Sequence, residues 1–133
     1  MNIEIGTEYS VSTVVDETNI ASKAKSGALP VFATPCMVAL MEQAAAELLQ
    51  KYLNGGSTSV GIQMNVSHLA ATAVGATVTA TAKVTAVDRR KVDFTVTAFD
   101  NAGMIGKGEH SRFVVDTEKF MAKAEERKNM IAE

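Results

Sequence analysis

The stretch TPCMVALMEQAAAELLQKYL, residues 34 to 53, decides the fold. Its apolar side chains recur at helical spacing, at Met37, Leu40, Met41, Ala44, Ala45, Leu48, Leu49 and Tyr52. Thr34 suits the N-cap of such a helix and Pro35 its first helical position, while Asn54-Gly55-Gly56 is expected to end it. Because few charges interrupt the stretch, we expect protein to surround this helix on most sides.

The segments on either side of the helix predict strands. Glu8 to Val15 precedes it, followed by a loop from 16 to 29 with a short helical turn at 19–24. That loop is either a plain connection or a flap over a pocket. After the helix, strands are predicted at 59–68, 77–87, 92–99 and 104–115, with polar turns at 88–91 and 100–103. Thr117 to Ala132 is expected to be a charged helix or tail with a narrow apolar stripe at Phe120, Met121 and Ala124.

One long apolar helix beside one antiparallel sheet should cover the inner face of that sheet. The sequence therefore predicts an α+β hot-dog fold, an antiparallel sheet wrapped around one long central helix, as a single domain over residues 1–133. Such domains usually join their sheets edge to edge, which removes an exposed strand edge. A homodimer, or a higher assembly of dimers, is expected.

Composition narrows the class of partner. The 133 residues are 47% hydrophobic and carry a net charge of −2 with both signs mixed, so no nucleic-acid partner is expected. Cys36 is the single cysteine, which favours a cytoplasmic protein without an internal disulfide. The N-terminus does not resemble a secretory signal, and no apolar run is long enough to predict a membrane span. The His and Cys residues do not fall at metal-site spacings, so no metal is predicted.

Two acidic residues of the helix differ in their surroundings. Glu42 has only apolar residues three and four positions away, so no local ion pair explains it. It lies either on a solvated strip or in a pocket, where a carboxylate could act as base or nucleophile. Glu47 precedes Lys51 by four residues, and these two are expected to form a surface ion pair.

His68 ends a strand of alternating residues. It shares strand parity with Val60, Ile62, Met64 and Val66. If the strand stays regular, its ring points towards the helix that carries Glu42. His68 is therefore either a buried structural histidine or a base that converges with Glu42 under a pocket.

The start of the helix carries two further candidates. Thr34 is a helix cap, a hydroxyl placed where the helix dipole favours a developing oxyanion, or both. Cys36 lies in the first turn, where a nucleophilic thiolate would be favoured, but a small buried cysteine is the expected role.

Glycine and arginine mark one face of the last strand. Gly106, Gly108, His110 and Arg112 share one parity, which gives a face open to close approach by a ligand or another chain. A surface position is the alternative for Arg112. Gly61 interrupts its strand in the same way and could admit an acyl group or a thioester carbonyl.

Three segments resemble the fluoroacetyl-CoA thioesterase-like hot-dog family. They are VFATPCMVALME at 31–42, VGIQMNVSHLAAT at 60–72 and GEHSRFVVD at 108–116. The resemblance implies a catalytic set of Thr34, Glu42 and His68, whose spacings are similar to those of the family. It also implies a substrate-side glycine at Gly61 and arginine at Arg112.

The resemblance implies hydrolysis of a short-chain acyl-CoA thioester to free acid and CoA, with no cofactor beyond the CoA of the substrate. Thr34 would attack or orient the carbonyl, and His68 would be general base and acid. Glu42 would orient His68, attack, or activate water, and Arg112 would contact the acyl group or carbonyl.

Residues 21–29 contain no aromatic, whereas the fluoroacetyl-specific enzyme is thought to close its pocket with aromatic residues in this loop. The resemblance thus implies thioester hydrolysis without implying fluoroacetyl specificity. The alternatives are a non-catalytic acyl-CoA or small-ligand binding protein, and a dehydratase-like hot-dog enzyme.

Overall fold

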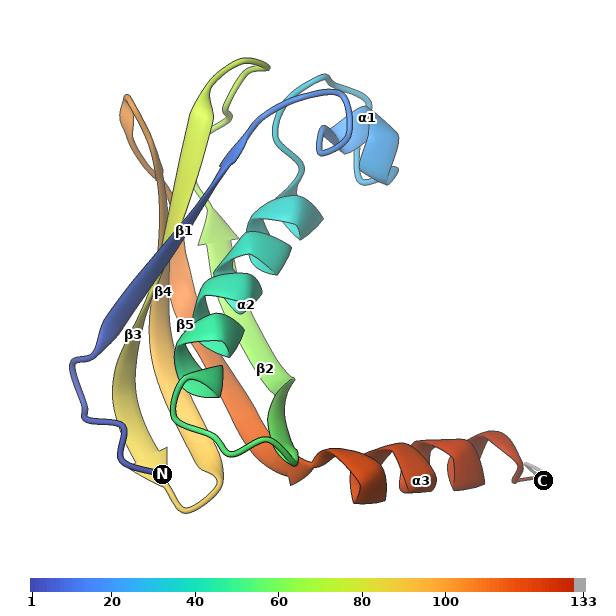
Figure 1. The fold of residues 1–133 in the computed structure, drawn as a ribbon. Helices are drawn as coiled ribbons and strands as arrows, with labels where there is room; N and C mark the ends of the chain where they lie inside the picture. The colour runs from blue at the N-terminus through green and yellow to red at the C-terminus, as the bar shows by residue number, and fades with distance from the viewer. Residues whose placement is uncertain (131–133) are drawn as a thin grey trace.

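An antiparallel sheet of five strands curves around one long helix in the computed structural model, which describes residues 1–130 (Figure 1). In chain order the elements are β1 (Glu8–Val14), α1 (Ala21–Ala24), α2 (Thr34–Gln50), β2 (Ser57–His68), β3 (Thr77–Asp88), β4 (Lys91–Asp100), β5 (Gly103–Asp116) and α3 (Thr117–Lys128). The strand order is β1-β3-β4-β5-β2, and each neighbouring pair is antiparallel. The α+β hot-dog prediction is confirmed.

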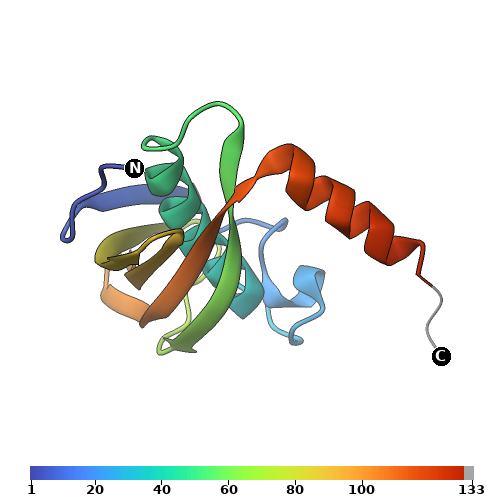
Figure 2. The same cartoon turned by 90° about the horizontal axis from the view of Figure 1, so that it is seen from below.

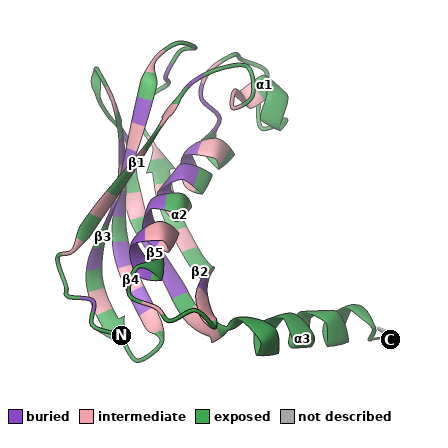
Figure 3. Cartoon of the chain, viewed as in Figure 1, coloured by how far each residue is buried: buried purple, intermediate pink, exposed green. Residues whose placement is uncertain are grey.

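The core lies between α2 and the concave face of the sheet (Figure 3). Seven of the eight apolar helix positions predicted to face the core are buried; Tyr52 lies beyond the end of α2 and is 37% exposed. Small residues of β3, such as Ala80 and Ala82, let the helix approach the sheet closely. Burial of each large apolar side chain contributes roughly 1.5–3 kcal/mol, so the face that α2 buries against the sheet is a major contribution to core stability.

The helix begins and ends differently from the prediction. Ala33, with extended backbone, occupies the N-cap position, and Thr34 is the first helical residue. The N-cap prediction for Thr34 is therefore wrong, because its hydroxyl bonds to a distant residue rather than to the helix. At the other end the helix stops at Gln50, one turn before Leu53.

The predicted surface pair between Glu47 and Lys51 is also wrong. Glu47 accepts hydrogen bonds from the Tyr9 hydroxyl, at 3.1 Å, and from the Gln43 amide, at 2.9 Å. The Lys51 ammonium instead lies 4.1 Å from the centre of the Tyr9 ring, a cation–π contact. Tyr9 of β1 thus contacts both residues, through its hydroxyl to Glu47 and through its ring to Lys51.

An irregularity in β2 changes which side chains face the helix. The register with β5 shifts between Gly61 and Gln63, and Ile62 falls in the gap with 52% exposure. Met64 and Val66 pack against the core, while Ser59 is buried and Gly61 lies beside a side chain of α2. The regular parity expected for Val60 and Ile62 is therefore wrong, because a bulge brings odd-numbered residues inward before it and even-numbered ones after it.

The C-terminal helix α3 continues directly from β5 and projects away from the sheet beyond the β2 edge (Figures 1 and 2). Asp116 caps it by accepting a hydrogen bond from the Lys119 amide at 3.0 Å. The predicted stripe is exposed, with Phe120 at 41% and Met121 at 53%. The last part of the predicted helix, residues 131–132, lies outside the described residues. Within residues 1–130, no helix has both the length and the apolar character needed to cross a membrane.

Candidate active site

Thr34 and His68 form a hydrogen-bonded pair where the start of α2 meets the end of β2. The Thr34 Oγ1 atom lies 2.7 Å from His68 Nδ1. Thr34 is exposed and His68 is half-buried, so a ligand can reach the hydroxyl. A hydroxyl at hydrogen-bonding distance from an imidazole is the arrangement that activates a nucleophile or a water molecule.

The His68 ring is held in a poorly solvated position. Its Nε2 atom is buried and has no hydrogen-bond partner among residues 1–130. Burial lowers the pKa of His68 below its usual 6.5, and the backbone of Ala70 opposes that effect only in part. The ring is therefore neutral at pH 7 and able to accept a proton.

A cavity of about 320 Å³ opens beside this pair. Its walls come from α1 and the following loop, from the start of α2, and from the segment after β2, at Ala21, Ser26, Val31, Phe32, Thr34, His68, Leu69, Ala70 and Ala71. Ala21 and Ser26 are small, whereas Val31 and Phe32, which follow in the same loop, are larger. The 16–29 segment thus lines a cavity, which fits the flap alternative better than a plain connection.

The helix end itself supplies few hydrogen-bond donors. The amides of Cys36 and Met37 both donate to the Ala33 carbonyl, and Pro35 has no N–H. The first turn of α2 therefore offers a helix dipole rather than a row of free amides. Cys36 is partly buried, and burial raises the pKa of its thiol, which disfavours a nucleophilic thiolate.

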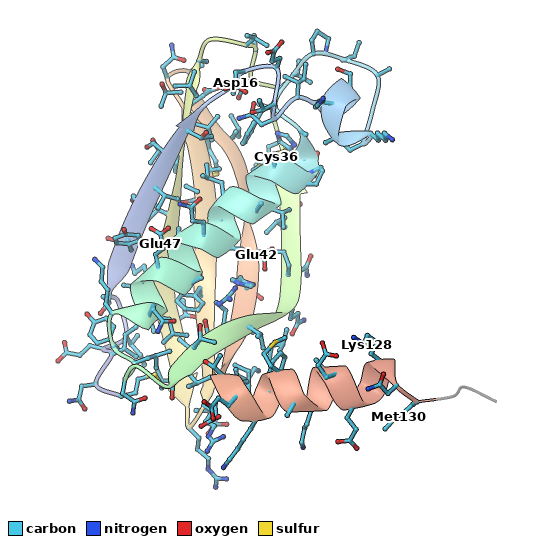
Figure 4. All side chains as sticks on the ribbon, turned by 45° about the vertical axis from the view of Figure 1, so that its right-hand side comes forward. Asp16, Cys36, Glu42, Glu47, Lys128 and Met130 are labelled. Atoms are coloured by element: carbon cyan, nitrogen blue, oxygen red, sulfur yellow. The ribbon has the colours of Figure 1, made fainter. Side chains whose placement is uncertain are left out.

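Glu42 belongs to a second cluster, two turns further along α2. Its Oε2 atom lies 3.7 Å from Nη1 of Arg112 on β5. A Cβ added to Gly61 would come within 2.7 Å of the same carboxylate oxygen, so only glycine leaves room for it. In Figure 4, Glu42 points from α2 towards β2 and β5, whereas Glu47 lies on the side of β1. Glu42, Gly61 and Arg112 are thus in one place.

The structure does not bring all three predicted catalytic residues together within one chain. Among the described residues, no hydrogen bond or ion pair links Glu42 to Thr34 or to His68. Eight helical residues separate Thr34 from Glu42, a rise of about 12 Å. His68 and Gly61 are seven strand residues apart, roughly 23 Å along β2. Thr34 with His68, and Glu42 with Arg112 and Gly61, form two separate half-sites.

Two buried residues that sequence reasoning did not select complete the second half-site. His110 on β5 is 2% exposed and hydrogen-bonds to Arg112, and Ser59 on β2 binds the same guanidinium. The shared parity of His110 and Arg112 was the only signal for the histidine. Ser59 gave none, because a regular strand would have turned it away from the helix.

The solved structures that are similar to this chain include hot-dog proteins and thioesterases. The structure of the fluoroacetyl-CoA thioesterase FlK is 34% identical in sequence, with a TM-score of 0.90, and the match covers 98% of this chain and 100% of FlK. A variant of FlK in complex with fluoroacetate and CoA has 35% identity and a TM-score of 0.84 over 89% of this chain and 99% of its own. A hot-dog-like protein from Thermanaerovibrio acidaminovorans has 29% identity and a TM-score of 0.87 over 96% and 94%. The fold and these relatives define a hot-dog-fold thioesterase.

The family is more specific than the fold. Residues 15–118 match the family described as fluoroacetyl-CoA-specific thioesterase. The fluoroacetyl-CoA thioesterase of Streptantibioticus cattleyicolor is 43% identical over 97 residues, which cover 73% of this chain and 70% of that protein. The chain belongs to the fluoroacetyl-CoA-specific thioesterase family and is an acyl-CoA thioester hydrolase.

Proposed function

We propose that the protein hydrolyses short-chain acyl-CoA thioesters with Thr34, His68 and Glu42 as its catalytic groups. The observation that carries this proposal is the 2.7 Å contact between Thr34 Oγ1 and His68 Nδ1 beside an open cavity. In the proposed tautomer the His68 proton is on Nε2, so the Thr34 hydroxyl donates to Nδ1, which is the direction needed to deprotonate it.

In the proposed first step, Thr34 Oγ1 attacks the thioester carbonyl carbon while its proton passes to His68 Nδ1. The C–S bond then breaks, and the same proton moves from Nδ1 to the CoA sulfur. Water, deprotonated by His68, attacks the acyl-threonine and releases the free acid, and the proton returns to Thr34. During each step Glu42 stabilises the positive charge on the His68 ring, as a carboxylate does in other nucleophile–histidine sites.

Glu42 can take that role only if it comes from a second copy of the chain. β2 has β5 on one side and an open edge on the other. Antiparallel pairing of two β2 edges about a two-fold axis at Asn65, with Ile62 outside the ladder on each strand, sets residue 61 of one copy opposite residue 68 of the other. The cluster of Glu42, Gly61 and Arg112 then approaches the Thr34–His68 pair of its partner, and the dimer has two complete sites.

The proposed acyl group is short and not restricted to fluoroacetyl. The cavity beside Thr34 has a volume of about 320 Å³, at the low end of ligand-sized pockets, which favours a short acyl group. Ala21 and Ser26 line the cavity together with Phe32, and residues 21–29 contribute no aromatic side chain to it.

Release of CoA thiol from a panel of acyl-CoAs tests the activity. Acetyl-, fluoroacetyl-, propionyl- and butyryl-CoA should all be hydrolysed, with kcat/KM differing by at most about 10- to 200-fold per methylene, because one methylene in an apolar pocket contributes roughly 1–3 kcal/mol. Octanoyl- and palmitoyl-CoA should be poor substrates. Release of no thiol from any short acyl-CoA would contradict the proposal.

Mixing two inactive variants tests the shared site. Glu42→Gln and His68→Ala should each retain only a small residual activity alone, whereas their mixture, after dissociation and reassociation, should regain activity because each mixed dimer contains one intact site. Thr34→Ala mixed with His68→Ala is the matched control, since both changes fall in the same half-site and no intact site can form. Equal activity in the two mixtures would contradict a site built from two copies.

A further inference from the structure

His110 is a buried histidine whose two ring nitrogens have different partners. Its Nδ1 atom lies 2.7 Å from the carbonyl oxygen of Gln63, which can only accept, so Nδ1 carries the proton. Its Nε2 atom lies 3.2 Å from Nη1 of Arg112, which can only donate, so Nε2 is unprotonated. The two contacts together define one neutral tautomer.

Arg112 is held on three of its nitrogens. Its Nε atom donates to Ser59 Oγ at 2.8 Å, its Nη2 atom donates to the Ser59 carbonyl at 3.0 Å, and Nη1 donates to His110. Nη1 is also the atom closest to the Glu42 carboxylate, at 3.7 Å. Arg112 as a residue is 7% exposed, whereas the Glu42 side chain is 42% exposed. A buried, hydrogen-bonded cation therefore faces a partly exposed carboxylate.

We propose that His110 is a positioning residue for Glu42, because it fixes the Arg112 guanidinium against which the carboxylate rests. This inference rests on the proposed function, in which Glu42 stabilises charge during thioester hydrolysis. His110 touches neither substrate nor reacting atoms; it acts through Arg112.

The bulge in β2 builds this arrangement. The register shift between Gly61 and Gln63 lies beside the Gln63 carbonyl that receives the His110 proton. A Cβ added to Gly61 would lie 2.7 Å from Glu42 Oε2, 3.2 Å from His110 Cε1 and 3.4 Å from Arg112 Nη1. One residue without a side chain thus lets three functional groups from α2 and β5 converge.

Charge on the His110 ring would undo this arrangement. Arg112 on its own strand and Glu42 on α2 are the charged groups that act on it, and the Phe94 ring of β4 stacks on it at 6.1 Å between centroids. Burial lowers the pKa of His110, the Gln63 carbonyl partly opposes this, and Arg112 lowers it further. A proton on Nε2 would remove the acceptor for Arg112 and set two cations side by side.

Nitrogen-15 NMR of the intact wild-type protein tests the tautomer. The chain has two histidines, so His110→Gln assigns the signals. At pH 7 the His110 ring should be neutral with the proton on Nδ1, opposite to the Nε2–H form that free imidazole side chains favour. A proton on Nε2, or a cationic ring, would overturn the proposal without any activity measurement.

Kinetics of His110→Phe and His110→Gln test the positioning role. His110→Phe keeps the aromatic stack but loses both hydrogen bonds, and kcat should fall by about tenfold or more with KM changed far less. The amide oxygen of His110→Gln can accept from Arg112, so this conservative variant should recover most of the loss. Equal losses in both variants, or kcat within twofold of wild type in His110→Phe, would overturn the proposal.

The Glu42→Gln background separates positioning from a general structural effect. If His110 acts through Glu42, adding His110→Phe to Glu42→Gln should reduce kcat no further. Multiplication of the two losses would show an independent structural role and would overturn the inference while leaving the proposed function intact. Wild-type activity in Glu42→Gln alone would instead overturn the role of Glu42 in the proposed function, and the inference with it.

Discussion

Gly61 lies so close to Glu42 that a β-carbon at residue 61 would come within 2.7 Å of the carboxylate. The backbone of Gly61 does not have a positive φ, so alanine can adopt its conformation. The added methyl group would overlap the Glu42 side chain, which must move because it is the flexible partner in the contact.

Gly61→Ala should therefore reduce activity without unfolding the protein. We expect kcat/KM to fall by about 10- to 100-fold, because a displacement of about 1 Å at a catalytic group has effects of that size. Thermal unfolding should shift by only a few degrees. Gly55→Ala is the matched control, since nothing lies within 4 Å of its added Cβ and its φ is also not positive. Equal activity in the two variants would show that the position of Glu42 does not matter.

Changes at Thr34 should separate its hydroxyl from its methyl group. Thr34→Ser keeps the oxygen 2.7 Å from His68 and should retain a large part of kcat. Thr34→Val has nearly the same shape without the hydroxyl, and kcat should fall by about 10²- to 10⁴-fold. Because Thr34 is exposed and makes no side-chain cap, the free energy of unfolding should change little in either variant. Undiminished turnover by Thr34→Val would remove Thr34 from the mechanism.

The pKa of His68 predicts how activity depends on pH. Only the neutral ring can accept the Thr34 proton, and burial lowers the pKa below 6.5. Activity should thus persist as the pH falls to 6.5 and decline only below it. The measurement is the midpoint of the acidic limb of kcat/KM, and a midpoint above 6.5 would contradict the prediction.

Stability should depend on pH through both histidines. Their folded pKa values are lowered, chiefly by burial, so the unfolded chain binds protons more readily than the folded one. The free energy of unfolding is thus highest above pH 6.5 and falls as the pH drops from 6.5 through the folded pKa values. Urea denaturation between about pH 4 and 8 measures this. His110→Gln should flatten part of the slope, and stability that rises on acidification in this window would be inconsistent with it.

Cys36→Ser should leave hydrolysis nearly unchanged. The thiol lies two residues from Thr34, but burial raises its pKa and keeps it protonated at pH 7. Thiol release from acetyl-CoA by this variant, at equal protein concentration, should be within about twofold of wild type, since no charge or hydrogen bond of either half-site is lost. A loss of two orders of magnitude would make the cysteine, rather than the threonine, the candidate nucleophile.

Features set by local periodicity could be predicted from the sequence. The apolar spacing from Met37 to Leu49 predicted both the helix and the face that it buries, and the two polar turns predicted the meander. The role of the Thr34 hydroxyl could not be predicted in this way. Its partner is 34 residues away, and a threonine before Pro35 has the same local pattern whether it caps the helix or binds a histidine.

The second half-site was hidden for a different reason. Assignment of faces on β2 assumed strict alternation, and nothing in residues 60–64 other than Gly61 marks a break. The register shift at Ile62 turns Ser59 and Gly61 towards the helix. There Ser59 accepts a hydrogen bond from Arg112, which also contacts His110. Resemblance to the family supplied Gly61 and Arg112 but not the two residues that hold the arginine.

Ile62, the bulge residue of β2, shifts the alternation of inward and outward side chains by one residue between the two ends of the strand. If Ile62 were part of the regular ladder, Ser57 to His68 would alternate in a single phase, and the apolar Val60 would turn inward while Ser59 and Gly61 turned to solvent. Deletion of residue 62, in contrast, would place Gln63 directly after Gly61 and would keep Ser59 and Gly61 on the helix side, in one phase with Met64 and Val66. The bulge therefore lets a polar segment and an apolar segment of opposite parity face α2 together, and replacement of Ile62 by another residue should be tolerated because its side chain is exposed and lies outside the ladder.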